Sequence, residues 1–317
     1  MVDSLLSALH LSARRVVHRE TGGCGCGAGT LADRADGTVV RHGDVVAKAH
    51  AGGTDPKELA VRLAVAAHPA LDGILLPPLR PAAVPTHGRL VTFWPYGTPV
   101  DPDRPEDAPW EAAAALLARL HATPVHRLPE AVPWMRGPLK AARAMDRLRA
   151  TAPDHPATAP VRRAWRTLPP WARAEAPYTH ARALCHGDLH LGQLVRGPAA
   201  GAEPWRLIDV DDLGLGDPAW DLARPAAWFA CGLLPAEDWA RFLAAYRSAG
   251  GAPRLSGPDP WPALDVPARA LTVQSAARAV AKAVEACRPL DEVEVAVVDA
   301  CDRMAGVPTQ LGRDAAK

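Results

Sequence analysis

The 317-residue chain has almost no net charge and no long apolar run, and each absence excludes a class of protein. Its formal net charge is +1, from 36 Lys and Arg against 35 Asp and Glu, which gives no electrostatic case for a nucleic-acid or membrane partner. No apolar run approaches the roughly 20 residues that span a bilayer. The mixed first ten residues lack the pattern of a secretory signal peptide. We therefore expect a cytoplasmic protein, with no nucleic-acid and no membrane partner.

The sequence also lacks a CxxC pair, although it contains six cysteines: Cys24, Cys26, Cys185, Cys231, Cys287 and Cys301. Cysteines scattered over a chain of this length favour free thiols in a reducing compartment over a disulfide framework. Cys24 and Cys26 form an isolated CxC among glycines. A metal site there would need two further ligands, and the local spacing supplies none, so we do not expect one.

The pattern of strands and helices predicts an α+β protein large enough for two lobes, with 48% hydrophobic residues to fill its cores. The β-branched pairs Val16–Val17, Val39–Val40 and Val45–Val46 predict short antiparallel strands, as does the run Leu90–Phe93. Asp55 and Pro56 have the residue types of a helix N-cap and first turn. Further helices are expected at residues 109–121 and at about 220–230, 236–248, 266–286 and 290–304.

A dense group of Asp and His residues lies beside two short apolar strands. Residues 185–193 read CHGDLHLGQ, and residues 207–212 read LIDVDD. Phosphoryl transfer would use such a group, because it needs a carboxylate that orients and deprotonates the attacking hydroxyl and oxygen ligands for Mg²⁺. Asp188 is the candidate base, and Gln193 and Asp209 are the candidate metal ligands. Asp211 and Asp212 stay ambiguous, with neither expected to be the principal metal ligand.

Four neighbouring residues are expected to support this group. His186 and His190 would hold the loop by hydrogen bonds rather than bind a metal. Asp217 and Asp221 would brace the loop and cap the helix that follows.

The segments HGDLHLGQ and IDVDDLGLGDPAWDLA resemble the catalytic and metal-binding segments of the aminoglycoside phosphotransferase family and, more broadly, of protein-kinase-like enzymes. The family pattern is HGD-x-H-x-x-N, then I-D, then G-D-P-x-x-D-L-A, and the match extends over about thirty-five residues. Gln193 stands where the pattern has Asn, as in the maltokinase-like branch, so the metal geometry must adjust to a longer side chain. The resemblance implies ATP and Mg²⁺ as cofactors and a bilobal protein-kinase-like fold, with a small β-rich N-lobe and a larger, mainly helical C-lobe.

The same resemblance divides the chain and implies a nucleotide site. Residues 1–96 would form the nucleotide-binding N-lobe, and residues 97–317 the helical C-lobe with the catalytic loop, metal site and acceptor pocket. The segment DVVAKA resembles the third-strand V-A-x-K of kinases, in which Lys48 would contact the nucleotide phosphates and Glu58 would pair with Lys48. The segment WPYG resembles a family hinge, which would place Trp94 and Tyr96 at the adenine.

The glycine-rich segment TGGCGCGAG at residues 21–29 contains no strict GxGxxG. It would either lie over the phosphates or serve as a mobile connector, and the sequence leaves both open.

The acceptor is the least determined part of the function. Residues 124–182 contain eleven Lys or Arg against four acids, which mildly disfavours a polycationic aminoglycoside, although the same arginines also fit a solvated helix face. Acids of the C-terminal helices could instead supply an acidic wall: Glu285, Asp291, Glu292, Glu294, Asp299 and Asp302.

Three functions therefore stay open. The first is phosphorylation of a hydroxyl of a small molecule, such as an antibiotic, sugar or amino alcohol. The second is phosphorylation of Ser or Thr in a precursor peptide during natural-product biosynthesis of the lanthipeptide type. The third, a catalytically inactive kinase-like binding module, is disfavoured because Lys48, Asp188 and Asp209 are all present.

Overall fold

The computed structural model describes residues 4–18, 24–34, 36–129, 131–177, 183–197 and 204–307. The expectations for residues 21–23 of the glycine-rich segment, and the charges counted at Glu130 and Arg182, lie outside the described residues. The chain forms two compact units that interleave along the sequence. The sheet unit comprises Met1–Pro109, Thr123–Pro133 and Leu191–Asp211, and the helical unit comprises Trp110–Ala122, Trp134–His190 and Asp212–Lys317. The expected division at residues 96 and 97 stays a prediction, because compactness alone does not locate a functional lobe.

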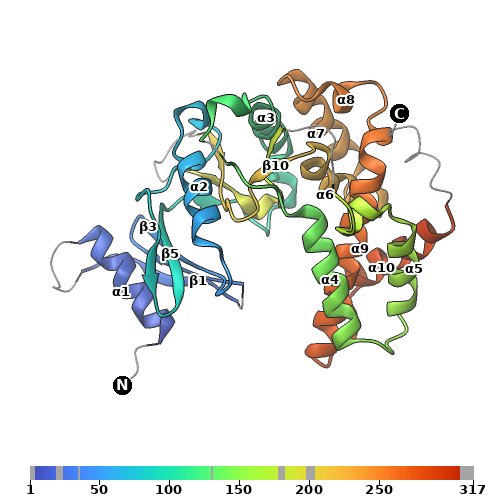
Figure 1. The fold of residues 1–317 in the computed structure, drawn as a ribbon, viewed down its shortest axis with the longest axis horizontal. Helices are drawn as coiled ribbons and strands as arrows, with labels where there is room; N and C mark the ends of the chain where they lie inside the picture. The colour runs from blue at the N-terminus through green and yellow to red at the C-terminus, as the bar shows by residue number, and fades with distance from the viewer. Residues whose placement is uncertain are drawn as a thin grey trace. The chain divides into compact units, whose positions relative to one another are not determined.

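An antiparallel five-stranded sheet in the order β1-β2-β3-β5-β4 forms the centre of the sheet unit (Figure 1). Its strands are β1 (Ala28–Arg34), β2 (Gly37–His42), β3 (Val45–His50), β4 (Val84–Thr86) and β5 (Arg89–Pro95). A smaller sheet in the order β6-β8-β9 joins Thr98–Pro99, Leu194–Arg196 and Trp205–Leu207. The strands expected around Val39, Val45 and Leu90 are confirmed. Helix α2 (Pro56–Ala66) begins as expected, with the Asp55 carboxylate accepting from the N–H groups of Lys57 and Glu58.

Helix α1 (Leu5–Val17) covers one face of this sheet, packing on β2 and β3. Because side chains alternate along a strand, one face carries the buried residues Val40, Val45, Ala47, Ala49, Val91 and Phe93. Leu9, Ala13 and Val16 pack against that face at helical spacing. The strand expected at Val16 and Val17 is therefore wrong, since both residues belong to the last turn of α1.

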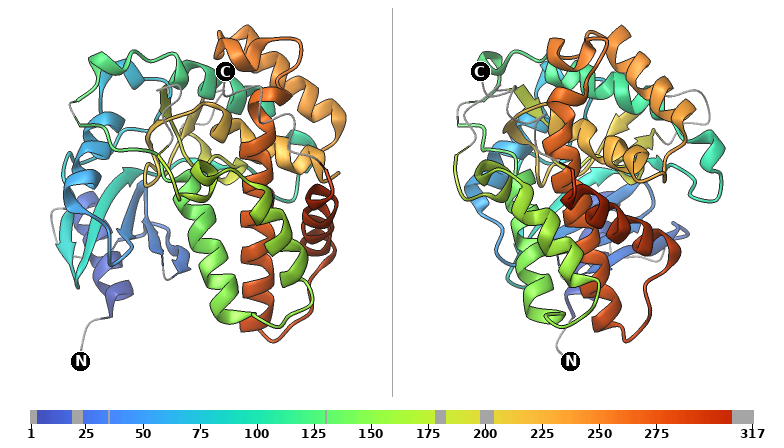
Figure 2. Two further views of the ribbon diagram at one scale, coloured as in Figure 1. Left: turned by 45° about the vertical axis from the view of Figure 1, so that its right-hand side comes forward. Right: turned by 90° about the vertical axis from the view of Figure 1, so that its right-hand side faces the viewer.

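The helical unit is built around the long, mostly buried helix α9 (Trp261–Glu285), which packs most extensively against four other helices (Figure 2). These are α4 (Gly137–Thr151), α5 (Thr158–Thr167), α6 (Ala219–Ala230) and α10 (Glu292–Ala305). The unit also contains α3 (Trp110–His121), α7 (Ala236–Ser248), α8 (Pro253–Ser256), and the strand pair β7 (Ala183–Cys185) and β10 (Gly214–Gly216). The helices expected from residue 109 onward are confirmed, with shifts of a few residues at their ends, and so is the α+β class.

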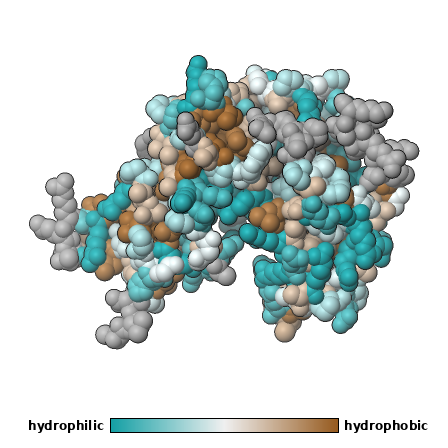
Figure 3. Space-filling model, viewed as in Figure 1, coloured by the Kyte–Doolittle hydropathy of each residue, from teal (hydrophilic) through white to brown (hydrophobic). Residues whose placement is uncertain are grey.

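The basic segment of the helical unit is largely a solvated surface. Helices α4 and α5 expose six arginines: Arg143, Arg147, Arg149, Arg162, Arg163 and Arg166. Hydrophilic residues accordingly dominate this part of the surface in Figure 3. Over the part of the chain that is described, no helix combines the length and the apolar character needed to cross a membrane.

We expect Leu9→Ala to destabilise the protein by about 2–4 kcal/mol, because Leu9 is 0% exposed in the core beneath α1. Leu11→Ala on the same helix is the matched control. Leu11 is 40% exposed, so its truncation should change the free energy of unfolding by no more than about 0.5 kcal/mol. Urea unfolding of both variants measures the difference, and equal losses would contradict the assignment of this helix face.

Candidate active site

Lys48 on β3 forms an ion pair with Asp209, a residue 161 positions away in the sequence. The Nζ–Oδ1 distance is 2.6 Å, and a second carboxylate oxygen, Oδ2 of Asp211, lies 3.0 Å from the same Nζ. All three residues belong to the sheet unit. The structure thus brings together the cation and one of the carboxylates that the sequence singled out.

The sheet face opposite α1 positions Lys48. Lys48 pairs in register with Thr92 of β5, so both side chains lie on this face, as does His50 two residues further along β3. The buried His50 ring links Oγ1 of Thr92, at 2.8 Å from Nε2, to Oδ1 of Asp211, at 2.8 Å from Nδ1. A continuous polar network therefore runs from β5 to Asp211.

Burial and charge oppose each other at this cluster, and charge dominates. Burial lowers the pKa of Lys48, but Asp209 and Asp211 outweigh it and raise the pKa well above its usual range. Burial raises the pKa of Asp211, but Lys48 and His50 outweigh it and lower the pKa well below its usual range. The ammonium of Lys48 and the carboxylate of Asp211 therefore both stay ionised at neutral pH.

Asp209 has a left-handed backbone with φ of 65°, a conformation that Asp tolerates better than most residues. Its Oδ2 lies 3.4 Å from Nε2 of the buried Gln193. The Gln193 side-chain amide directs its N–H group at Asp209, and flipping the amide would direct Oε1 there instead. Asp209 and Asp211, together with Gln193 once its amide is turned, could offer the oxygen ligands that Mg²⁺ prefers.

The structure does not pair Glu58 with Lys48, so that expected contact is wrong for this structure. Glu58 forms an i,i+4 ion pair with Arg62 at 2.8 Å, and its side chain is 46% exposed. Asp209 and Asp211 already pair with Lys48, and Glu58 pairs within α2 instead. No feature of the sequence distinguished Asp211 from Glu58 as the partner of Lys48.

Trp94 and Tyr96 are well fixed on and beside β5. Trp94 is buried in the strand and donates its indole N–H to Oγ1 of Thr92. The N–H of Tyr96 donates to the carbonyl of Asp44, and Arg41 lies over the Tyr96 ring, with Cζ 3.4 Å from the ring centroid. Their role at an adenine stays a prediction.

In the helical unit, two cations hold the carboxylate of Asp188. Lys140 lies 2.7 Å from Oδ2, and Arg224 lies 2.6 Å from Oδ1. Burial raises the pKa of Asp188, but Lys140 and Arg224 outweigh it and lower the pKa to about 2. Arg224 also donates from Nε to the carbonyl of Leu189, which fixes the loop beside the carboxylate.

Asp221 on α6 anchors the loop that carries Asp188. Its carboxylate accepts from the backbone N–H groups of His186 and Gly187, each at 2.7 Å, and lies 2.9 Å from Nε2 of His121. Burial raises the pKa of Asp221, but the hydrogen bond from His121 outweighs it, so the net shift is downward. Asp217 caps the same helix through the N–H of Ala219 at 3.0 Å. The expected bracing and capping roles are thus seen in the structure.

Lys140 and Arg224 are the two residues at Asp188 that the sequence did not single out. Arg224 directly follows the D-L-A of the motif, a position that could have drawn attention to it. Lys140 lies within the basic segment and carries no local signal. It also binds Asp212 at 2.6 Å, next to the Arg136–Asp212 pair at 2.9 Å, so the ambiguous Asp212 belongs to the cation network of the helical unit.

Comparison with known proteins assigns the chain to a family. Residues 31–266 match the model of the phosphotransferase enzyme family. The chain belongs to this family. The expected enzyme class, a phosphotransferase with an alcohol group as acceptor, is thereby confirmed. No curated protein sequence matches the chain.

Solved structures share the fold of this phosphotransferase. A choline/ethanolamine kinase family protein from Mesorhizobium loti has 17% identity and a TM-score of 0.59, with 96% of each chain covered. A thermostable mutant of aminoglycoside phosphotransferase APH(4)-Ia, in ternary complex with AMP-PNP and hygromycin B, has 14% identity and a TM-score of 0.59, covering 93% of this chain and 98% of that one. Spectinomycin phosphotransferase APH(9)-Ia, in complex with ADP and spectinomycin, has 13% identity and a TM-score of 0.56, with 90% of each chain covered. At these identities the likeness concerns the fold, and it confirms the expected kinase-like fold class.

We expect Gly187→Ala to disrupt the loop that carries Asp188. Gly187 has φ of +84°, and an added Cβ would lie 2.3 Å from the carbonyl oxygen of Asp212. Gly232→Ala is the matched control, because Gly232 has φ of +77° with no atom within 4 Å of an added Cβ. Gly187→Ala should cost at least about 2 kcal/mol more than the control in urea unfolding. Equal losses would show that the clash does not matter.

Proposed function

We propose that this phosphotransferase transfers the γ-phosphate of ATP, with Mg²⁺, to a hydroxyl of a small molecule. The observation that carries the proposal is the Lys48–Asp209 pair, with Gln193 beside it. A cation next to two carboxylates and an amide is what a metal-bound triphosphate requires, since the cation contacts phosphate oxygens and the other groups hold the metal. Structural neighbours that contain AMP-PNP or ADP support an adenine nucleotide as the donor.

The sheet unit would bind the nucleotide. Lys48 would exchange its carboxylate partners for the nucleotide phosphates, and Asp209 and Gln193 would then hold Mg²⁺ with their oxygens. When bound, Mg²⁺ neutralises the charge that develops on the phosphate oxygens. Trp94 and Tyr96 would flank the adenine.

Asp188 would act on the acceptor. As the acceptor oxygen bonds to the γ-phosphorus and the bridging P–O bond breaks, the hydroxyl proton passes to Asp188 and ADP leaves with the electron pair. A carboxylate with a pKa of about 2 is a weak base. Asp188 would therefore mainly orient the acceptor hydroxyl, and would take its proton only once the bond to phosphorus has made that proton acidic. Arg224 and Lys140 keep it ionised, and a carboxylate has enough lone pairs to accept the hydroxyl beside them.

The proposal that Asp188 acts on the phosphate held by Lys48 and Asp209 rests on the family to which the chain belongs.

The charges around Asp188 restrict the acceptor. Arg136, Lys140 and Arg224 face the two carboxylates of Asp188 and Asp212. A hollow next to Asp188 is further lined by Gly137, Leu189, Trp220, Leu271 and Gln274. Three cations against two carboxylates suit a neutral or singly charged hydroxyl compound better than a polycationic aminoglycoside. No observation favours a precursor peptide as acceptor.

Mass spectrometry can test this function directly. The protein is incubated with ATP and Mg²⁺ and with four classes of acceptor: neutral sugars, amino alcohols with one charge, polycationic aminoglycosides, and a Ser/Thr peptide. Phosphate gain on a neutral or singly charged compound is expected. Transfer to aminoglycosides alone would contradict the charge argument, transfer to the peptide alone would contradict the small-molecule assignment, and no Mg²⁺-dependent binding of ATP would contradict the donor.

Asp188→Asn should lower turnover by roughly 10²–10⁴-fold while leaving ATP binding nearly intact. Because the pKa of Asp188 is about 2, its carboxylate is fully ionised between about pH 5 and pH 8. The ratio of wild-type to variant turnover should therefore be constant over that range. Steady-state assays across pH measure it, with Asp146→Asn on the exposed face of α4 as the control. A ratio that shrinks toward acid pH would contradict the low pKa.

Asp209→Ala should abolish Mg²⁺-dependent nucleotide binding, because it removes the carboxylate proposed to hold the metal. Calorimetry with ATP, in the presence and absence of Mg²⁺, measures the loss. The exposed Asp107→Ala of the same unit is the control and should bind as the wild type does. Unchanged Mg²⁺-dependent binding in Asp209→Ala would show that the metal has other ligands.

A further inference from the structure

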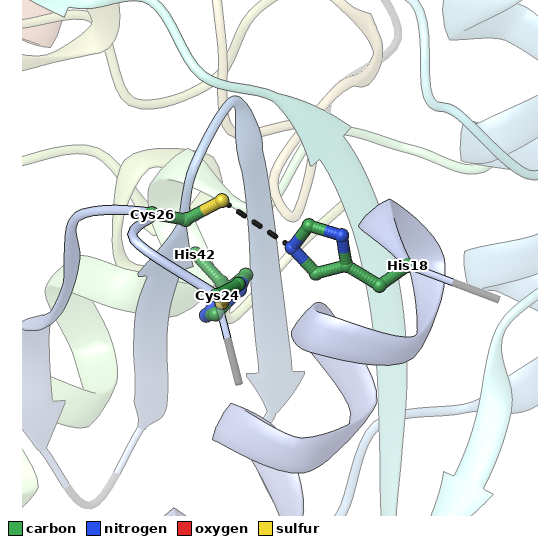
Figure 4. Close-up of side chains that lie close together, drawn as sticks. All are labelled: His18, Cys24, Cys26 and His42. Atoms are coloured by element: carbon green, nitrogen blue, oxygen red, sulfur yellow. Dashed lines mark hydrogen bonds between the residues drawn. The ribbon is translucent and has the colours of Figure 1, made fainter. Parts of the chain in front are cut away.

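Two cysteines and two histidines converge beside the β2–β3 turn of the sheet unit. His18 directly follows α1, Cys24 and Cys26 lie in the loop before β1, and His42 ends β2. One ligand atom from each of the four lies within 4.8 Å of all the others. Figure 4 shows His18 and Cys26 pointing toward each other from the end of the helix and from the loop.

The distances inside this cluster are close to those of a tetrahedral metal site. Cys26 Sγ lies 3.3 Å from His18 Nε2, and Cys24 Sγ lies 3.3 Å from His42 Nε2. Zinc bonds of about 2.3 Å to sulfur and about 2.0–2.1 Å to nitrogen give a tetrahedron whose S···N edge is about 3.6 Å. All separations between the four ligand atoms are at most 4.8 Å, a limit that exceeds the S···S edge of about 3.8 Å by only about 1 Å. Small side-chain rotations would thus complete the tetrahedron.

We propose that His18, Cys24, Cys26 and His42 form a structural zinc site. Two thiolates balance the charge of Zn²⁺, and two neutral imidazoles complete the Cys₂His₂ set. Soft sulfur with imidazole in a tetrahedral arrangement selects zinc over the hard cation Mg²⁺. Four protein ligands leave no open position for water or substrate, which is the mark of a structural rather than a catalytic site.

The backbone around the cluster is already arranged for such a site. The N–H of Gly43 donates to the carbonyl of Gly27 at 2.8 Å, which holds the cysteine loop against the β2–β3 turn. Gly43 has φ of +56°, and a Cβ added there would lie 3.7 Å from Cys26 Sγ. His42 is 6% exposed. The loop is thus fixed at a position where its thiols reach a histidine of the sheet.

The site would fasten the end of α1 to the sheet. His42 pairs in register with Val45, whose side chain belongs to the core that α1 covers. Lys48 is three residues from Val45 along β3, so it faces the opposite side of the sheet. The zinc would therefore stabilise the face of the sheet that α1 covers, opposite the face that carries Lys48.

Zinc binding can be measured without any acceptor or activity. The full chain is purified under reducing conditions with Zn²⁺, and metal content is measured by mass spectrometry; we expect about one zinc per chain. Co²⁺ substituted for zinc should give the intense visible bands of tetrahedral coordination and a thiolate charge-transfer band. Weak bands of octahedral cobalt would overturn the proposal, even if every ligand variant failed to fold.

The ligand variants provide the matched comparison. Cys24→Ser with Cys26→Ser should lower zinc affinity by at least about 10²-fold, whereas Cys287→Ser, an exposed cysteine of the helical unit, should retain the wild-type stoichiometry. Removing zinc from the wild type should lower the melting temperature by about 5 °C or more. Wild-type zinc content in the double cysteine variant, or a zinc-treated wild type without zinc, would overturn the proposal and leave the proposed phosphotransfer unaffected.

Discussion

The ion pair between Lys48 and Asp209 is the contact on which the proposed chemistry depends. Lys48 is mostly buried, with 14% of its side chain exposed, and an ammonium group withdrawn from water in this way is tolerated only when anions compensate it. Asp209 and Asp211 provide that compensation within the protein. The same two carboxylates are oxygen ligands of the kind that Mg²⁺ prefers. A triphosphate with its metal would replace the internal ion pairs by equivalent ones, so the charge of the cluster would stay balanced in both states.

In the helical unit, the partly buried charge of Asp188 is likewise compensated by ions of opposite sign. Lys140 and Arg224 compensate one carboxylate, and Lys140 extends the network to Asp212. Asp221 fixes the loop that carries Asp188, because its carboxylate accepts hydrogen bonds from two backbone N–H groups that have no partner within a strand or helix. Each unit therefore contains a charged cluster that is internally paired, which explains why burial alone does not decide the pKa values at either one.

The β2–β3 hairpin illustrates how one sheet can serve two purposes. Because side chains alternate along each strand, Val40, His42 and Val45 lie on the face that α1 covers. Lys48 and His50 lie on the opposite face, in the polar network. Stability then arises on one face, from apolar packing and the proposed zinc ligands, while the chemistry occupies the other. Because a shift of one residue would exchange the two faces, the register of this hairpin is under strong constraint.

The family, the α+β class and three local features could be predicted without the structure: Asp55 capping α2, the loop that carries Asp188, and the lysine of β3. These features depend on residues that are near one another in the chain. Tertiary structure decided which distant groups meet. It replaced Glu58 by Asp211 beside Lys48, placed Lys140 and Arg224 at Asp188, and brought His18 and His42 to the cysteines of a loop whose sequence had argued against a metal. The reason is physical, since periodicity and motifs report the conformation of a segment, whereas contacts between segments depend on how the sheet and helices pack.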